Sequence, residues 1–141
     1  MVVAMALFNI FGKKDVSSEL TRNFPYRLFT EWIPYKLYSN KNNSCTLNVK
    51  IKNLTKETLL TSIVAELPDP LGFDQTGISK QREVRIGEVA PGDEREVGIE
   101  VFGNVNSDPG EYTVTLTAIA HYRDYGHIIN AVKKRTSLQV V

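Results

Sequence analysis

The most regular alternation of apolar and polar residues covers residues 108–122, where a tight turn leads into a strand-like pattern. Side chains of a β-strand alternate between two faces, so this spacing gives one apolar face and one threonine face. The apolar set is Tyr112, Val114, Leu116, Ala118 and Ala120, and the opposite set is Thr113, Thr115 and Thr117. This stretch therefore predicts a central strand of a β-sheet.

Six shorter stretches show the same period of two and predict further strands. They cover residues 26–38, 45–51, 59–67, 82–89, 94–102 and 128–141. Pro34 interrupts the first of them, and proline is tolerated in sheets mainly at edges and bulges. We therefore expect a broken first strand that leaves one sheet for the other. No sustained 3.6-residue period competes with this pattern.

About seven strands with turn signals at roughly ten-residue spacing are typical of a β-sandwich or barrel. The start of the central strand, with Asp108, Gly110 and Tyr112, resembles the tyrosine corner of immunoglobulin-like domains. Val114 stands where antibody domains carry a cysteine, so the resemblance is to the broad architecture. We predict an all-β, immunoglobulin-like sandwich of two antiparallel sheets over residues 24–141, preceded by an apolar N-terminal segment and linker over residues 1–23.

Two turn motifs sharpen this resemblance. Residues 86–93 have the sequence Ile-Gly-Glu-Val-Ala-Pro-Gly-Asp, and residues 109–115 have the sequence Pro-Gly-Glu-Tyr-Thr-Val-Thr. Together they resemble the CARDB-type immunoglobulin-like modules of archaeal and bacterial proteins, over residues 37–141. The resemblance implies an adhesion, spacer or binding module, and its motifs include no catalytic residue.

Composition narrows the function classes. Among 141 residues, 17 basic and 16 acidic side chains leave a formal net charge of +1, so we expect no nucleic-acid partner. Cys45 is the only cysteine, which excludes an intrachain disulfide and favours a reducing compartment, the cytoplasm. Its place on the apolar face of a predicted strand indicates a small core residue.

The N-terminal segment is apolar over residues 1–11, and Lys13 and Lys14 follow it. Eleven residues are fewer than the roughly 20 that an apolar helix needs to span a bilayer, and the charge order does not fit a signal peptide. Met1 to Lys14 could instead lie on a membrane surface, pack on a second subunit, or pack on the domain itself. The residues suited to such a contact are Leu7, Phe8 and Phe11.

Two sequons for N-glycosylation, residues 42–44 and 53–55, would be used only in an exported chain. An exported carbohydrate-binding or adhesion module is therefore the first alternative, and a glycan at Asn42 or Asn53 would favour it.

The turn joining the last two predicted strands carries the most chemistry. His121, Asp124 and His127 could hold a metal in principle, but six residues separate the histidines and no further ligand follows. A metal-dependent enzyme is thus the weakest alternative, and we expect no cofactor. Tyrosine and histidine on a protruding loop of a rigid sandwich suit a binding edge better. The partner-binding candidates at this turn are Tyr122, Arg123, Tyr125 and His127.

Residues 67–81 form the longest irregular stretch, with no sustained period. Loops of this length are usually functional or disordered. Leu71 and Phe73 are costly to leave in water, so they contact a partner or fold back over one end of the core. The sequence as a whole predicts a non-catalytic protein-interaction or self-association module, membrane-peripheral if its N-terminus binds lipid.

Overall fold

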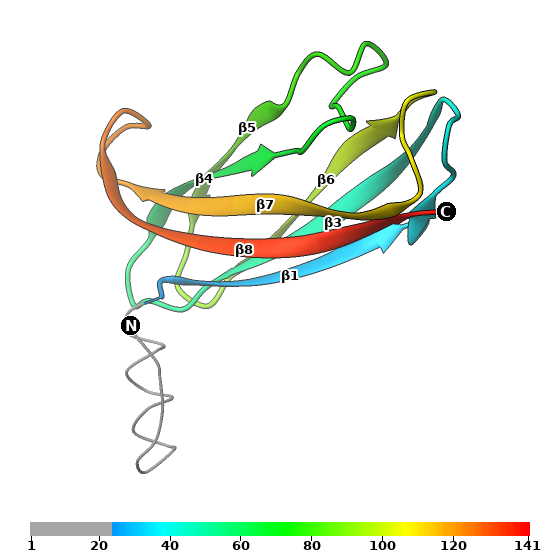
Figure 1. The fold of residues 1–141 in the computed structure, drawn as a ribbon. Helices are drawn as coiled ribbons and strands as arrows, with labels where there is room; N and C mark the ends of the chain where they lie inside the picture. Colours follow the sequence, from blue (N-terminus) through cyan, green and yellow to red (C-terminus); the bar gives the residue numbers. More distant parts are fainter. Residues whose placement is uncertain (1–23) are drawn as a thin grey trace, which may run out of the picture.

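Eight strands in two facing sheets make up the computed structural model, which describes residues 24–141 (Figure 1). The strands are β1 (Tyr26–Ile33), β2 (Lys36–Leu37), β3 (Asn43–Asn53), β4 (Leu59–Glu66), β5 (Gln81–Val89), β6 (Glu94–Gly103), β7 (Gly110–His121) and β8 (Ile128–Val140). The all-β prediction is confirmed for the described residues. The predictions for residues 1–23 lie outside them.

One sheet has the strand order β1-β3-β6, and the other has the order β2-β8-β7-β4-β5. As the position of Pro34 predicts, the first strand is broken: β1 belongs to the smaller sheet and β2 to the larger. The two-residue strand β2 pairs with β8 in parallel, while the other strand pairs are antiparallel. The larger sheet is therefore mixed and not purely antiparallel, because β2 runs in the same direction as its neighbour.

The core lies between the two sheets. The inward faces of β3 and β7 each contribute four of its residues, and these are the ones that the alternation predicts. They are Cys45, Leu47, Val49 and Ile51 from β3 and Val114, Leu116, Ala118 and Ala120 from β7, all buried. Aliphatic side chains that leave water in this way supply the main stabilisation of the fold.

A tyrosine corner is present at the start of β7. The Tyr112 hydroxyl donates a hydrogen bond of 2.7 Å to the carbonyl oxygen of Asp108, four residues upstream. This bond fixes the chain where it enters the central strand, as the resemblance to immunoglobulin-like domains implies.

The edges of the two sheets meet along β1 and β8. Lys134 Nζ donates a hydrogen bond of 3.0 Å to the carbonyl oxygen of Leu28, and Trp32 Nε1 donates one of 3.2 Å to Thr136 Oγ1. These bonds close one side of the sandwich by joining a strand of each sheet.

The irregular segment 67–80 covers one end of the core. Leu71 and Phe73 are buried, and Gly72 pairs with Phe102 through two backbone hydrogen bonds of 3.0 and 2.8 Å. The sequence left open whether these side chains contact a partner or fold back over the core, and the structure shows that they fold back. Leu71 and Phe73 are therefore corrected from candidate partner contacts to core residues.

Candidate partner-binding surface

The turn between β7 and β8 is a closed loop that protrudes from one end of the sandwich (Figure 1). The backbone N–H of Tyr122 donates to the carbonyl oxygen of His127 at 2.9 Å, which closes the base of the loop. Asp124 Oδ1 accepts hydrogen bonds of 2.8 Å from the backbone N–H of Gly126 and from His127 Nδ1. Carboxylates commonly stabilise turns in this way, so the loop has a defined shape.

The charge of Asp124 is part of this arrangement. Its pKa lies below the usual value, chiefly because His127 donates a hydrogen bond to the carboxylate and also because the Gly126 N–H does so. A carboxylate that accepts such bonds favours its ionised form. His127 is thus engaged on the outside of the loop, with its ring exposed.

Tyr125 fastens the loop to the outer face of the larger sheet. Its ring packs edge-on against His121, with centroids 5.0 Å apart, and the Arg85 guanidinium lies 4.6 Å above it. His121 is only 4% exposed, and its Nε2 lies 2.7 Å from Ser62 Oγ. An irregularity in the pairing at Ala120 and His121 accompanies this arrangement. Tyr125 is therefore an anchor of the loop more than a free contact residue.

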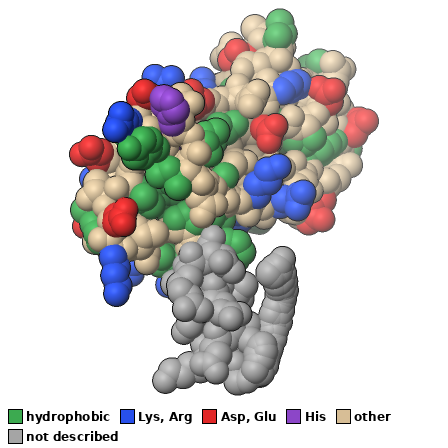
Figure 2. Space-filling view, turned by 90° about the vertical axis from the view of Figure 1, so that its left-hand side faces the viewer, with side chains coloured by type: hydrophobic (Ala, Val, Ile, Leu, Met, Phe, Trp, Pro, Cys, Tyr) green, Lys and Arg blue, Asp and Glu red, His purple; other side chains and the backbone are tan. Residues whose placement is uncertain are grey.

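Large hydrophobic side chains remain exposed around the loop. Tyr122 is 54% exposed, Ile128 is 65% exposed and Ile129 is 57% exposed. The Arg123 guanidinium lies 5.0 Å from the Tyr122 ring. We name these four residues the hairpin face. Figure 2 looks at this end of the sandwich and shows hydrophobic side chains gathered there, with acidic and basic side chains around them.

Sequence reasoning found Tyr122 and Arg123 but missed Ile128 and Ile129, which it assigned only to a closing strand. A signal was present, because two adjacent isoleucines break the alternation that one buried face requires. Both are exposed at the start of β8, where the strand pairs with β7 alone and the register shifts opposite Ala120 and His121.

The metal candidates do not converge. His121 points to Ser62 beneath the loop, whereas His127 binds Asp124 on its outer side. Within residues 24–141, no group of three or more histidine, cysteine, aspartate or glutamate side chains is arranged to hold a metal ion.

The two sequons differ in accessibility. Asn53 is 1% exposed, and its amide donates to the carbonyl oxygens of Glu57 and Val89 and accepts from the backbone and hydroxyl of Thr55. A glycan on Asn53 would remove these bonds. Asn42 is exposed, so it is the sequon that the folded domain can present.

The N-terminal candidates Leu7, Phe8 and Phe11, and the membrane contact through Met1 to Lys14, lie outside the described residues. In residues 24–141, no helix has the length and apolar character needed to cross a bilayer.

No protein-family model matches the chain, and no curated protein is similar to it in sequence. Among solved structures, it resembles a fragment of native alpha-2-macroglobulin from Escherichia coli, with 16% identity and a TM-score of 0.58 over 84% of this chain. It also resembles a mutant Salmonella alpha-2-macroglobulin, with 19% identity and a TM-score of 0.55 over 83% of this chain.

A third similar structure is the native conformation of Escherichia coli alpha-2-macroglobulin, with 18% identity and a TM-score of 0.53 over 99% of this chain. This chain spans only 17%, 7% and 7% of the three proteins. At such identities the likeness shows the fold alone. With the two-sheet topology and the tyrosine corner, it supports the immunoglobulin-like sandwich.

Proposed function

We propose that this chain is a non-catalytic interaction module, of the CARDB-type kind among immunoglobulin-like sandwiches, which binds a protein partner through the hairpin face. The observation that carries the proposal is the exposure of Tyr122, Ile128 and Ile129, each more than half accessible, on one well-anchored loop and strand end. Exposed apolar side chains that cluster at one place mark interaction sites more often than isolated ones do.

The anchoring of the loop favours binding. Asp124 fixes its turn, and Tyr125 packs it against His121 and Arg85. Because these contacts exist before a partner arrives, little conformational freedom is lost on association. Tyrosine and arginine, which Tyr122 and Arg123 supply, are enriched among the residues that dominate binding energy. The partner chemistry that fits is an apolar protein surface with a group that can face Arg123.

The test is site-specific photo-crosslinking in cells that express the chain natively. A benzophenone amino acid replaces Tyr122, and the products are compared with and without Ile128→Ser and Ile129→Ser. We expect a defined set of products that disappears in the double serine variant. A matched control is Ile78→Ser, because Ile78 is exposed on segment 67–80 at the opposite end of the sandwich. Products that survive Ile128→Ser and Ile129→Ser contradict the proposal.

Self-association is the simplest version of this function. Sedimentation equilibrium of the same variants distinguishes self-association from binding to another protein. If the chain self-associates, the apparent mass of the unaltered protein rises with concentration, and the mass of the double variant Ile128→Ser, Ile129→Ser stays that of a monomer.

We propose the cytoplasm as the compartment, because a single buried cysteine suits a reducing environment.

A membrane-peripheral role through Met1 to Lys14 is the second candidate. Its support is the order of residues, with an apolar run followed by Lys13 and Lys14. Liposome flotation of the full chain beside a version without residues 1–14 tests it. The role is supported if the full chain floats and the shortened chain does not, and it is contradicted if both chains behave alike.

For the exported alternative, the glycan to look for is at Asn42, because Asn53 is buried.

A further inference from the structure

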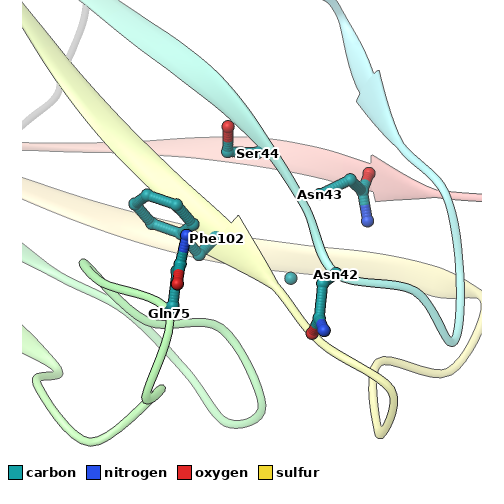
Figure 3. Close-up of a pocket in the computed structure, with 6 residues that line it drawn as sticks. Asn42, Asn43, Ser44, Gln75 and Phe102 are labelled. Carbon is teal, nitrogen blue, oxygen red and sulfur yellow. The ribbon is translucent and has the colours of Figure 1, made fainter.

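A pocket of about 440 Å³ lies at the end of the sandwich opposite the hairpin face, the end where β3 starts and β6 finishes (Figure 1). Figure 3 shows the residues that line it. It is formed where the start of β3, the end of β6 and the segment 67–80 come together. Its lining residues are Asn42, Asn43, Ser44, Gln75, Phe102 and Gly103. This volume falls within the roughly 300–1,000 Å³ of small-ligand sites.

Hydrogen bonds within the domain hold the walls of this pocket in place. Gly72 and Phe102 exchange two backbone bonds of 3.0 and 2.8 Å, and Asn104 Nδ2 donates to the carbonyl oxygen of Pro70 at 3.0 Å. These contacts attach the segment 67–80 to the end of β6. Asn43 accepts from the backbone N–H of Tyr38 at 2.8 Å and donates back to its carbonyl oxygen at 3.0 Å. The amide of Asn43 is therefore part of the wall.

Gln75 stands on a second fixed turn. Asp74 Oδ1 accepts hydrogen bonds from the backbone N–H groups of Thr76, at 3.0 Å, and Gly77, at 3.2 Å, and from the Thr76 hydroxyl. The Thr76 hydroxyl bond is the main reason that the pKa of Asp74 lies below its usual value. The ionised carboxylate thus holds the turn that carries Gln75 at the rim of the pocket.

The groups left for a ligand are neutral. Within residues 24–141, no hydrogen bond joins the side-chain amide of Asn42 or of Gln75 to another described group. Each amide offers both donors and an acceptor. Ser44 Oγ donates to Glu100 Oε2 at 3.1 Å and retains its acceptor capacity. The Phe102 ring adds an apolar, half-buried surface to the same pocket.

This combination fits one class of small molecule. Neighbouring hydroxyl groups act as donors and acceptors at once, as a carboxamide does, and the C–H face of a sugar ring is apolar enough to pack on an aromatic ring. A phosphate or nucleotide would need cationic side chains, and the lining has none. A metal ion would need several carboxylate, imidazole or thiolate ligands, which the lining also lacks.

We propose that this pocket binds a neutral sugar unit through Asn42, Gln75 and Phe102. The site is separate from the hairpin face, so this proposal can be tested independently of the proposed protein partner. Few polar contacts and an open position correspond to weak binding, with a Kd of about 1–10 mM.

The test is a ¹H–¹⁵N NMR titration of the full chain with glucose, galactose, mannose and N-acetylglucosamine, each added separately, and with inorganic phosphate. We expect saturable shifts for at least one sugar at the side-chain amides of Asn42 and Gln75 and the backbone of Phe102 and Gly103. The substitutions Asn42→Ala and Gln75→Ala should each weaken binding about tenfold, equivalent to the loss of roughly 1.4 kcal/mol.

Two matched controls distinguish a site from a general surface effect. Asn106→Ala removes an exposed amide at the same end but outside the lining, and Gln139→Ala removes one on β8. Both should leave the affinity unchanged. The proposal is overturned if no sugar shifts the pocket residues, if the controls weaken binding as much as Gln75→Ala, or if phosphate binds there and the sugars do not.

Discussion

Asn53, at the end of β3, holds together three segments near the hairpin end of the sandwich. Its side-chain amide donates to Glu57 at 2.8 Å and to Val89 at 2.9 Å, and its side-chain oxygen accepts from Thr55. Its backbone exchanges two further bonds with the turn before β6, one from Gly92 and one to Asp93. A buried amide with its polar atoms paired is stabilising, whereas removing it leaves several groups unpaired.

We therefore expect Asn53→Ala to lower the free energy of unfolding by about 2–4 kcal/mol. Urea denaturation followed by Trp32 fluorescence measures it. Asn106→Ala, at an exposed position, is the control and should change the stability by less than about 0.5 kcal/mol. An equal effect of both substitutions would contradict the role assigned to Asn53.

Two buried side chains, a phenol and a thiol, should make the fold less stable at alkaline pH. Burial raises the pKa of the Tyr26 phenol from 10.0 to about 12, although a hydrogen bond with Thr61 partly opposes this. Burial also raises the pKa of the Cys45 thiol from 9.0 to about 12, with a smaller contribution from the nearby charge of Glu100. Both groups are neutral in the folded chain over a range where they would ionise in the unfolded chain.

Stability should accordingly be complete below about pH 9 and fall as the pH rises toward about 12, because the unfolded state releases protons first. In thermal melts across this range, Tyr26→Phe should flatten the decline above pH 10, since phenylalanine has no proton to release. At neutral pH the same variant loses the bond to Thr61, which costs about 1 kcal/mol. A decline as steep as in the unaltered protein would argue against Tyr26 as a cause.

At the scale of elements, the tyrosine corner ties β7 to the turn before it. Tyr112→Phe removes only the hydroxyl that bonds the Asp108 carbonyl. We expect a loss of about 0.5–1.5 kcal/mol in the free energy of unfolding. Tyr38→Phe provides the comparison, because Tyr38 is exposed and its hydroxyl has no hydrogen bond among the described residues. If both variants unfold at the same urea concentration as the unaltered chain, the corner is not stabilising here.

Removing the carboxylate of Asp124 should loosen the β7–β8 turn and leave the stability of the rest of the fold unchanged. In Asp124→Ala the Gly126 amide loses its acceptor, so its hydrogen exchange should quicken while the melting temperature stays unchanged. Asp124→Asn keeps an acceptor oxygen and should restore much of the protection. Because the pKa of Asp124 is lowered, its carboxylate stays ionised in mild acid, and the protection of Gly126 should weaken, as in Asp124→Asn, only when the pH falls through that lowered value.

The strands were predictable because each has one face in the core, which forces alternation at residues such as Leu47 and Leu116. Leu71 and Phe73 were ambiguous, since an irregular segment buries its side chains with no period. The burial of His121 depends on Tyr125 folding back over it, and sequence spacing carries no sign of that contact. The pocket lined by Asn42, Gln75 and Phe102 was likewise not predictable, because three segments far apart in the sequence build it.

Over the whole molecule, the two candidate sites occupy opposite ends of one rigid sandwich (Figure 1). The hairpin face belongs to the β7–β8 end, and the pocket lies beside the segment 67–80. Between them lies the continuous core, closed on one side by the bonds from Lys134 and Trp32. Because the sites are separate, the proposed protein partner and the proposed sugar would not compete for the same surface.

The paths of β1 and β8 also determine how the domain bears load. The described chain enters at the hairpin end through β1 and finishes at the opposite end through β8 (Figure 1). Tension between Phe24 and Val141 therefore runs along both strands and loads the β1–β3 and β7–β8 hydrogen bonds together, in shear. Tension between Phe24 and Tyr122, which lie at the same end, would peel bonds one after another. In single-molecule pulling, the first geometry should need markedly more force, which would suit a domain that transmits tension along its length.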